Sequence, residues 1–415
     1  MDAPMSGTGQ PRSEGRAMQA SWGDSSQAQT HLIQPPSISL PKGGGAIRGM
    51  GEKFAANPVT GTGSMTVPIA TSPGRSGFGP QLSLSYDSGA GNGPYGFGWS
   101  LSLPAITRKT DKGLPRYRDW SNDPHESDVF VLSGSEDLVP VLRQGAAGLE
   151  IHDDVIDGYR VRRYRPRIEG LFARIERWQW IPTSSDPRPE AEQRADVHWR
   201  SISKDNILTI YGANASSRIA DQLDPERVFS WLICESRDDK GNAIRYLYKA
   251  EDGANTLRPG QDDPYRQVHQ RNRGTANDPR RTAQRYLQRV LYGNRIPLLD
   301  AQGKRPRRLS NLPNPPTDTA ADWLFEVRFD YGELNDADPT GTAEQPWFYR
   351  PDAFSIYRSG FEVRTCRRCE RVLMLHHIPG PEGYEGVVRS TEFVYDDEID
   401  PTIASKPVYS FLAQV

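Results

Sequence analysis

The chain has 415 residues, a formal net charge of −2 at pH 7 and 36% hydrophobic residues. This charge excludes a strongly basic nucleic-acid binder, and three cysteines exclude a disulfide scaffold. The 38 glycines and 34 prolines favour many short strands and turns over long helices. No stretch approaches the roughly 20 apolar residues of a membrane span. We therefore expect no nucleic-acid partner and no membrane span.

The N-terminal segment, residues 1–36, is rich in Ser, Gln, Gly and Ala and has almost no large apolar side chains. It cannot bury enough surface to offset chain entropy, so we expect a disordered tail. The first 20 residues also lack the apolar run of a secretory signal peptide. If the protein leaves the cell, we expect it to use another route.

Short strands separated by glycine-rich turns are predicted from Ser37 onward. Leu82–Tyr86 alternates apolar and small polar residues, which is typical of a strand with one buried face. Asp87–Pro94 follows as a glycine-rich turn. In Tyr95–Leu101 aromatic residues alternate with glycines, which allow positive φ or a close backbone approach while the rings cover the gap.

Two hairpins are predicted in the middle of the chain. Arg200–Ser203 and Ile207–Tyr211 flank the short polar turn Lys204–Asn206. The clearer hairpin is Val228–Lys249, whose turn is Asp238–Asn242. We expect Gly241 and Asn242 to supply the positive φ angles that a tight β turn needs.

A strand with two different faces is predicted at Trp323–Tyr331. Trp323 and the alternate residues up to Tyr331 are aromatic or apolar, so that face is expected to be buried or stacked. The intervening Glu326 and Asp330 are expected to face water or a polar interior. Thr282–Tyr292 fits a helix and a strand equally well.

Two stretches, Ser184–Arg194 and Asp252–Asp278, are expected to be loops because they are rich in breakers or lack periodicity. Arginines cluster in two other places. We interpret both clusters as solvated faces or salt-bridged strands, with an anion-binding patch as the less favoured alternative. The clusters are Arg160, Arg162, Arg163, Arg165 and Arg167, and Arg280, Arg281, Arg285 and Arg289.

Two motifs suggest cofactors but lack the required context. Gly91–Gly96 matches G-x-G-x-x-G, yet Pro94 and the surrounding glycines do not open a helix that could bind a pyrophosphate. Cys366 and Cys369 are followed by the adjacent His376 and His377, whose side chains would leave a strand on opposite faces. We therefore expect neither a nucleotide nor a metal site.

Evidence for other chemistry is equally weak. The chain has no G-x-S-x-G elbow for a nucleophilic serine. Asp87, Asp238 and Asp239 could bind calcium, but isolated aspartates in turns more often form Asx turns. We expect no cofactor, no metal and no catalytic residue.

Several motifs in consistent order resemble the N-terminal region of the SpvB family, over roughly Ser37 to the C-terminus. The motifs are Leu40–Ile47, Gly51–Phe54, Gly61–Gly63, Pro80–Tyr86, Phe97–Leu101, Ser203–Asn206, Asp239–Asn242, Tyr292–Arg295, Phe329–Gly332 and Tyr357–Thr365. The hairpin at Asp239–Asn242, followed by Tyr246 and Tyr248, is also similar to the tyrosine-aspartate repeats of Rhs proteins.

The resemblance implies a structural role. The family includes B components of insecticidal toxin complexes, whose N-terminal region resembles the start of a hollow β shell. With the Rhs-repeat C component, that shell encloses a toxic segment, and the B component docks on a pore-forming A component through a propeller. No propeller repeats follow here, so we expect a chain truncated relative to longer members, with an open sheet edge.

One family member carries ADP-ribosyltransferase activity in its C-terminal domain. Such transferases resemble each other in an Arg, a Ser-Thr-Ser strand and a later Glu-x-Glu. Here Glu190–Glu192 precedes Ser390–Glu392, so the order is reversed and the strand motif is broken. The sequence therefore predicts that this chain is not an enzyme.

Residues 37–415 are thus predicted to form one all-β unit, an extended twisted sheet of hairpins with few short helices, as part of a shell that encapsulates or helps deliver a toxin. The alternatives are an autonomous glycan- or receptor-binding β module and an enzyme of a type the sequence does not reveal. We expect a secreted location without a signal peptide, after residence in the cytoplasm of the producing bacterium. The residues expected to matter most, all structurally, are Gly43, Gly44, Gly45, Trp99, Asp239, Gly241, Asn242 and Phe329.

Overall fold

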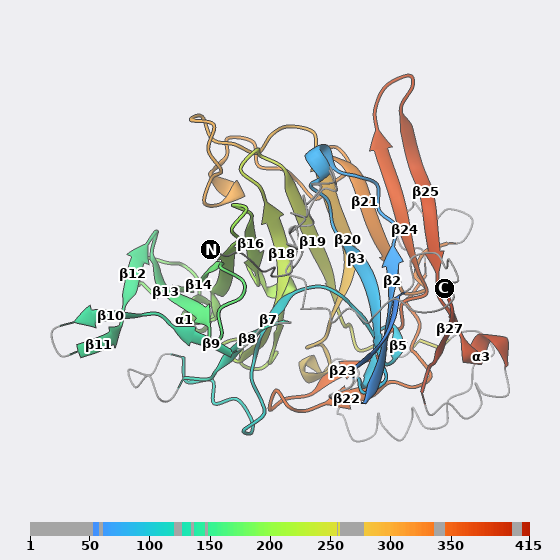
Figure 1. Cartoon of the computed structure of the whole chain (residues 1–415), viewed down its shortest axis with the longest axis horizontal. Helices are drawn as coiled ribbons and strands as arrows, with labels where there is room; N and C mark the ends of the chain where they lie inside the picture. Colours follow the sequence, from blue (N-terminus) through green and yellow to red (C-terminus); the bar gives the residue numbers. More distant parts are fainter. Residues whose placement is uncertain are drawn as a thin grey trace, which may run out of the picture. The chain divides into compact units, whose positions relative to one another are not determined.

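One large antiparallel sheet organises the chain in the computed structural model (Figure 1). All described residues belong to one unit, residues 31–415. Fifteen of the described strands belong to this sheet, as the hairpin-rich sequence predicts. The structure describes residues 61–119, 127–133, 137–145, 148–254, 256–257, 278–335, 345–400 and 409–415, together with the backbone of 53–57.

Eight strands of the sheet close into a ring. The strand β18 pairs through Trp231 with Ile106 of β7 on one edge, and through Glu235 with Ile210 of β16 on the other. The strand order therefore returns to its start. The ring consists of β7 (Ala105–Arg108), β8 (Phe130–Leu132), β9 (Asp137–Pro140), β13 (Tyr159–Pro166), β14 (Arg174–Trp180), β15 (Val197–Ile202), β16 (Leu208–Tyr211) and β18 (Val228–Arg237).

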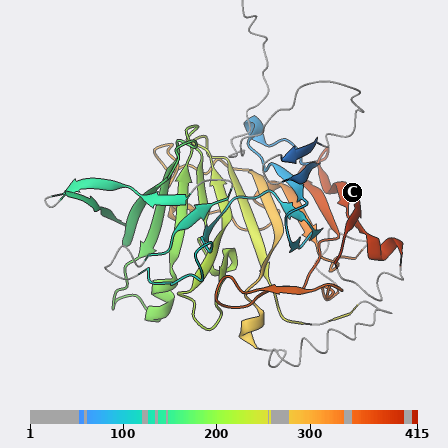
Figure 2. The same ribbon diagram turned by 60° about the horizontal axis from the view of Figure 1, so that its bottom comes forward.

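Beyond the ring the same sheet continues as an open extension. The C-terminal part of β18 pairs with the next strand, starting at Arg237 opposite Ala243, and each later strand adds in turn. Figure 2 shows these strands side by side with those of the ring. The strands of the extension, in spatial order, are β19 (Ala243–Ala250), β20 (Arg285–Asn294), β21 (Trp323–Asp330), β24 (Arg371–Ile378) and β25 (Tyr384–Glu392).

A smaller N-terminal sheet packs on the extension. Its side chains Ile69 and Leu84 share a core with Tyr292 of β20 and Met374 of β24. The hydroxyl of Tyr292 donates to the backbone oxygen of Ser72 at 2.7 Å, which ties the two layers together. The strands of this sheet are β1 (Lys53–Asn57), β2 (Thr62–Ile69), β3 (Leu82–Asp87) and β6 (Trp99–Leu101).

The remaining described elements are short. The hairpin β10–β11 is largely exposed and stands apart from the ring in Figure 1. None of the described helices is long and apolar enough to cross a membrane. These elements are β4 (Asn92–Gly93), β5 (Gly96–Phe97), β10 (Leu142–Gly145), β11 (Gly148–Ile151), β12 (Asp153–Ile156), β17 (Arg218–Ala220), β22 (Phe354–Ile356), β23 (Val363–Thr365), β26 (Val394–Tyr395), β27 (Leu412–Gln414), α1 (Glu190–Ala195) and α3 (Asp396–Ile399).

Aromatic side chains fill the ring. Phe130 lies 4.9 Å from Trp199 and 5.8 Å from Trp231, measured between ring centroids, and all three are fully buried. Edge-to-face contacts of this kind stabilise a core beyond the area they bury. The sequence predicted an extended twisted sheet with an open edge, whereas this end of the sheet closes on itself around a packed core.

The ambiguous segment and the two predicted loops can be compared with the structure. The ambiguous segment Thr282–Tyr292 is mostly strand, because β20 runs from Arg285 to Asn294. The predicted loop Ser184–Arg194 is partly wrong, since α1 begins at Glu190 after Pro189. Acidic residues in its first turn and an ion pair of 2.6 Å between Arg194 and Glu190 favour this short helix. Most of the other predicted loop, Asp252–Asp278, lies outside the described residues.

Candidate functional site

The turn between β18 and β19 is held by Asp238. Its Oδ1 accepts hydrogen bonds from the backbone N–H of Lys240 at 2.9 Å and of Asn242 at 2.8 Å. The side chain of Asn242 donates to the other carboxylate oxygen of Asp238 at 2.7 Å. Asp239, which the sequence singled out, is exposed at the tip. The carboxylate that organises this turn therefore belongs to Asp238 and not to Asp239. It forms an Asx turn, as expected for isolated aspartates.

Gly241 has the predicted left-handed conformation, with φ at +84°. A β-carbon there would lie 2.8 Å from the backbone nitrogen of Leu298, so the close approach excludes other residues. The expectation for Asn242 is wrong, because it does not share this conformation. Asn242 stands next to β19, and the bonds from its buried amide to Asp238 explain its place in the turn.

The turn is also attached to the next strand of the extension. The side chain of Asn294 donates to the backbone oxygen of Gly241 at 2.9 Å and accepts from the backbone N–H of Ala243 at 2.8 Å. Asn294 is buried at the end of β20. This joint fixes the hairpin at the place where the ring and the extension separate.

In the segment around Trp99, glycine allows aromatic rings to pack closely against the backbone, as its sequence predicts. Gly98 has φ at +81°, and a β-carbon on it would lie 2.5 Å from the ring of Tyr86. That ring packs against Trp99 with centroids 5.2 Å apart. Gly91–Gly96 contains the two-residue strands β4 and β5 rather than a helix start, so it offers no phosphate-binding helix end.

Strand β21 has the two predicted faces from Phe325 onward, whereas Trp323 packs in a separate cluster with Leu291. Phe329 is fully buried in the main core, whereas Glu326 is fully buried on the opposite, polar face. Glu326 accepts two hydrogen bonds from Arg289, at 2.7 and 2.9 Å, and one from His377 at 3.2 Å. Burial alone would raise the pKa of Glu326, but these hydrogen bonds outweigh it and hold the pKa well below its usual range.

The cysteine and histidine residues do not converge. Cys366 and Cys369 are buried and are not joined in a disulfide, and burial raises the pKa of Cys369 well above its ordinary value. His376 and His377 follow each other on β24, with Ser72 at 2.6 Å from the first and Glu326 at 3.2 Å from the second. No group of three or more His, Cys, Asp and Glu residues that could bind a metal is present in the described ranges.

The acidic motifs considered for catalysis lie apart. Glu190 and Glu192 are exposed on α1, and Ser390–Glu392 belongs to β25 at the end of the extension. Asp87 accepts from the backbone N–H of Gly89 at 2.8 Å, which is an Asx turn. On β13, Arg162 forms a bidentate pair with Asp153 at 2.7 and 2.8 Å. That part of the arginine cluster is a salt-bridged strand, as interpreted from the sequence.

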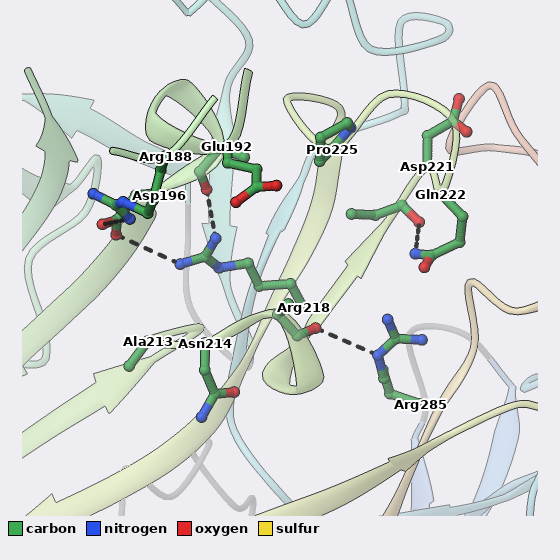
Figure 3. Close-up of a pocket in the computed structure, with 13 residues that line it drawn as sticks. Arg188, Glu192, Asp196, Ala213, Asn214, Arg218, Asp221, Gln222, Pro225 and Arg285 are labelled. Atoms are coloured by element: carbon green, nitrogen blue, oxygen red, sulfur yellow. Dashed lines mark hydrogen bonds and ion pairs between the residues drawn. The ribbon is translucent and has the colours of Figure 1, made fainter. Parts of the chain in front are cut away.

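Beside the ring lies a pocket of about 380 Å³ that the sequence did not predict (Figure 3). Arg218 extends across it and donates to the backbone oxygen of Gly212 at 2.6 Å. Arg188 pairs with Asp196 at 3.0 Å, while Arg285 donates to backbone oxygens, including that of Thr282 at 2.7 Å. A second pocket shares Asp221 and Gln222 with the first.

The described residues that line this pocket are mostly charged or small. Among the described residues, no Ser, Thr, Cys, His, Lys or Tyr lines it. Asp196 is paired with arginine, and Asp221 accepts from Arg227 at 2.7 Å outside the lining. Arg218 has a pKa lowered by burial, against the pull of Asp196. Together with the exposed carboxylate of Glu192, these groups could orient a polar ligand.

Comparison with known proteins gives a family over most of the chain. The family described as "Salmonella virulence plasmid 65kDa B protein" matches residues 57–378. The chain belongs to the SpvB family. It is 35% identical over 382 residues to "Mono(ADP-ribosyl)transferase SpvB" of Salmonella choleraesuis and, equally, of Salmonella typhimurium. These alignments cover 90% of this chain and 56% of each relative, so the chain spans about half of their length.

Solved structures of this family and of toxin complexes share the fold. The N-terminal domain of the effector protein SpvB from Salmonella typhimurium matches with a TM-score of 0.62 and 32% identity, over 84% of this chain and 96% of that one. The TcdB2-TccC3 crystal structure matches with a TM-score of 0.65 and 31% identity, over 92% of this chain and 16% of that one. The Tc holotoxin pore of Photorhabdus luminescens also matches, with a TM-score of 0.65 and 30% identity, over 93% and 16% respectively. The SpvB-family resemblance and the all-β shell-like fold predicted from sequence are thereby confirmed.

The glycines Gly43, Gly44 and Gly45, predicted to be structural, lie outside the described residues. The same is true of the predicted disordered tail, residues 1–36, and of the boundary at residue 37. These expectations stay predictions.

Proposed function

We propose that this chain is a non-catalytic wall segment of a shell that encapsulates a toxin or helps deliver it. The observation that carries the proposal is the sheet itself, which is sealed at the β16–β18 end and finishes at β25 on the other side. An unpaired strand edge is a template for another strand. A wall that is closed at one end and open at the other is suited to continuation by further protein.

The ADP-ribosyltransferase activity in the relatives' names is proposed to belong to the part of those proteins that this chain does not match. Two observations support this assignment. The similarity extends over nearly all of the structure described as the N-terminal domain of SpvB. In this chain the Glu190–Glu192 motif is exposed on α1, while Ser390–Glu392 lies on the last strand of the extension.

The partner proposed at β25 is an Rhs-repeat component of a toxin complex, adding its own strands to the sheet. A pore-forming component would be contacted through regions that this chain does not match. Likeness to the TcdB2-TccC3 and Tc holotoxin structures supports toxin-complex partners as a class. The proposed location is extracellular after release, and the cytoplasm of the producing bacterium before that.

The proposal is tested by mixing the purified chain with an Rhs-repeat protein encoded beside it and measuring mass by size-exclusion chromatography with light scattering. A stable complex with a defined mass ratio is expected. Monomers of both proteins across micromolar concentrations would contradict a wall segment. A panel assay with NAD, ester and glycoside substrates should give no turnover that a point substitution abolishes.

A second candidate is an autonomous binding module for a glycan or receptor, favoured by the sealed ring and the pocket beside it. This candidate predicts a monodisperse monomer that binds a ligand without any partner protein. A glycan array with the isolated chain separates the two, because the wall segment is expected to show no saturable glycan binding.

A further inference from the structure

A buried arginine on the outer face of the ring has no acidic partner in the part of the chain that the structure describes. Arg200 of β15 is 5% exposed, and its guanidinium lies 3.7 Å above the centre of the Trp178 ring. Its Nε donates to the imidazole Nε2 of His198 at 3.1 Å. No carboxylate oxygen of the described residues comes within 4.0 Å of this guanidinium. Buried arginines are normally paired, because an isolated buried charge is costly.

A second arginine reaches the same place from the extension. Arg308 belongs to the segment between β20 and β21, and its guanidinium lies 4.6 Å from the centre of the Tyr159 ring. Its Nη2 is enclosed and has no hydrogen-bond partner in the described part of the chain. It too has no described carboxylate within 4.0 Å. The rings of Trp178 and Tyr159 that carry the two guanidinium groups have centroids 5.9 Å apart, and neither group has a counter-charge among the described residues.

The acids near this cluster are already engaged. Glu176 faces Arg200 across the strand pair, but its oxygens accept from Arg174 at 2.5 Å and from the indole of Trp178 at 3.0 Å. Arg237, a third cation, pairs with Glu235 at 2.6 Å. This leaves an excess of positive charge around Arg200 and Arg308.

The lowered pKa values of Arg200 and His198 agree with this excess of positive charge. Burial, followed by the charges of Arg308 and Arg237, lowers the pKa of Arg200 to about 10. Burial and the charges of Arg200, Arg218 and Arg308 lower the pKa of His198 well below its ordinary value. His198 is therefore neutral and accepts a hydrogen bond from Arg200. It adds no positive charge to the cluster and does not neutralise the charge of Arg200.

We propose that Arg200 and Arg308 together bind an oxyanion of the phosphate or sulfate class. The terminal nitrogens of Arg200 have no hydrogen-bond partner among the described residues, so their N–H groups remain to be satisfied by an ion. Planar guanidinium groups present parallel N–H donors that fit such anions. The site lies on the outer face of the ring and does not depend on the proposed shell function.

The test is the thermal unfolding of the purified chain in phosphate, sulfate, acetate or chloride at equal ionic strength. Phosphate and sulfate are expected to raise Tm by about 2–4 °C over chloride at tenfold the dissociation constant. Isothermal titration with inorganic phosphate should give one site per chain. No heat and no shift, or a shift with acetate alone, would overturn the proposal.

Arg200→Met and Arg308→Met are the deciding variants, and Arg165→Met, at an exposed position of β13, is the matched control. Arg200→Met removes an uncompensated buried charge, so it should fold in chloride and no longer respond to phosphate. The control should respond like the unmodified chain. An equal phosphate shift in Arg200→Met and in the control would place the ion elsewhere and refute the site.

Discussion

Within the ring, the strand order returns to its start and Trp199, Trp231 and Phe130 fill the enclosed space. Within the extension, one face packs on the N-terminal sheet and the other holds buried charges such as Glu326. The outer edge of its last strand pairs with no other described strand. The comparison shows that one sheet can combine a self-sufficient core with a surface prepared for continuation. Stability is expected to concentrate in the ring, and assembly in the extension.

The largest loss of stability is expected from a substitution in the core of the ring. Trp231 is fully buried, contacts Phe130 and donates from its indole to the backbone oxygen of Val197 at 2.9 Å. Trp231→Ala should lower the free energy of unfolding by about 3–5 kcal/mol, because it leaves a cavity and an unpaired carbonyl. Urea denaturation followed by circular dichroism measures the loss. Leu149→Ala, at a position 68% exposed, is the control and should be close to neutral.

The extension should depend more on buried ion pairs. Arg367 and Glu251 have fully buried side chains and form two hydrogen bonds, the longer one 3.1 Å. Arg367→Met should cost about 3 kcal/mol, because Glu251 is left without its counter-charge. Adding Glu251→Gln should restore much of the loss in urea titrations. If the double variant is as unstable as the single one, packing rather than charge holds this region.

The joint between the two regions can be tested through its glycine. Gly241→Ala meets both an unfavourable φ and the backbone nitrogen of Leu298 at 2.8 Å, so a loss of about 2–3 kcal/mol is expected. Gly303 has a similar φ of +69°, but a β-carbon added to it would have no atom within 4 Å. Gly303→Ala should therefore cost only about 1 kcal/mol. Equal midpoints for both variants would show that the close approach does not matter.

The smallest effect is expected from pH. Hydrogen bonding to Glu326 is the main reason that the pKa of His377 is raised in the folded state, with Glu385 adding to it. A raised folded pKa means that the stabilisation is complete below the unfolded value of about 6.5 and is lost as the pH rises through the folded pKa. Stability measured against pH should fall across this window in the unmodified chain and stay flatter in His377→Gln. If stability falls as steeply with pH in His377→Gln as in the unmodified chain, His377 is not the cause of this pH dependence.

Local pattern was sufficient to predict much of the fold. The alternation at Trp323–Tyr331 indicated one apolar and one polar face, and the breakers at Asp238–Asn242 indicated the hairpin, because both signals lie within a few residues. The pairing of Ile210 with Glu235 that closes the ring could not be predicted. This pairing contains a bulge that shifts the register between β16 and β18. In addition, neither strand carries a sequence signal that identifies its partner strand.

The polar sites were harder still to foresee. Arg367 and Glu251 are 116 residues apart in sequence, and Arg308 reaches the ring from a segment of the extension. Such pairs have no periodicity or spacing, so only the folded chain brings them together. At the hairpin turn the sequence emphasised Asp239, although Asp238 accepts the bonds, because both residues suit a turn equally well.

Hydrogen exchange of β25 tests the central claim most directly. In the isolated chain, the β25 amides that do not face β24 are expected to exchange quickly, since β25 ends the sheet. On binding the neighbouring Rhs-repeat protein they should become protected, while the amides of Trp199 and Trp231 in the ring change little. Binding that leaves β25 exchanging as before would contradict continuation of the sheet through this edge.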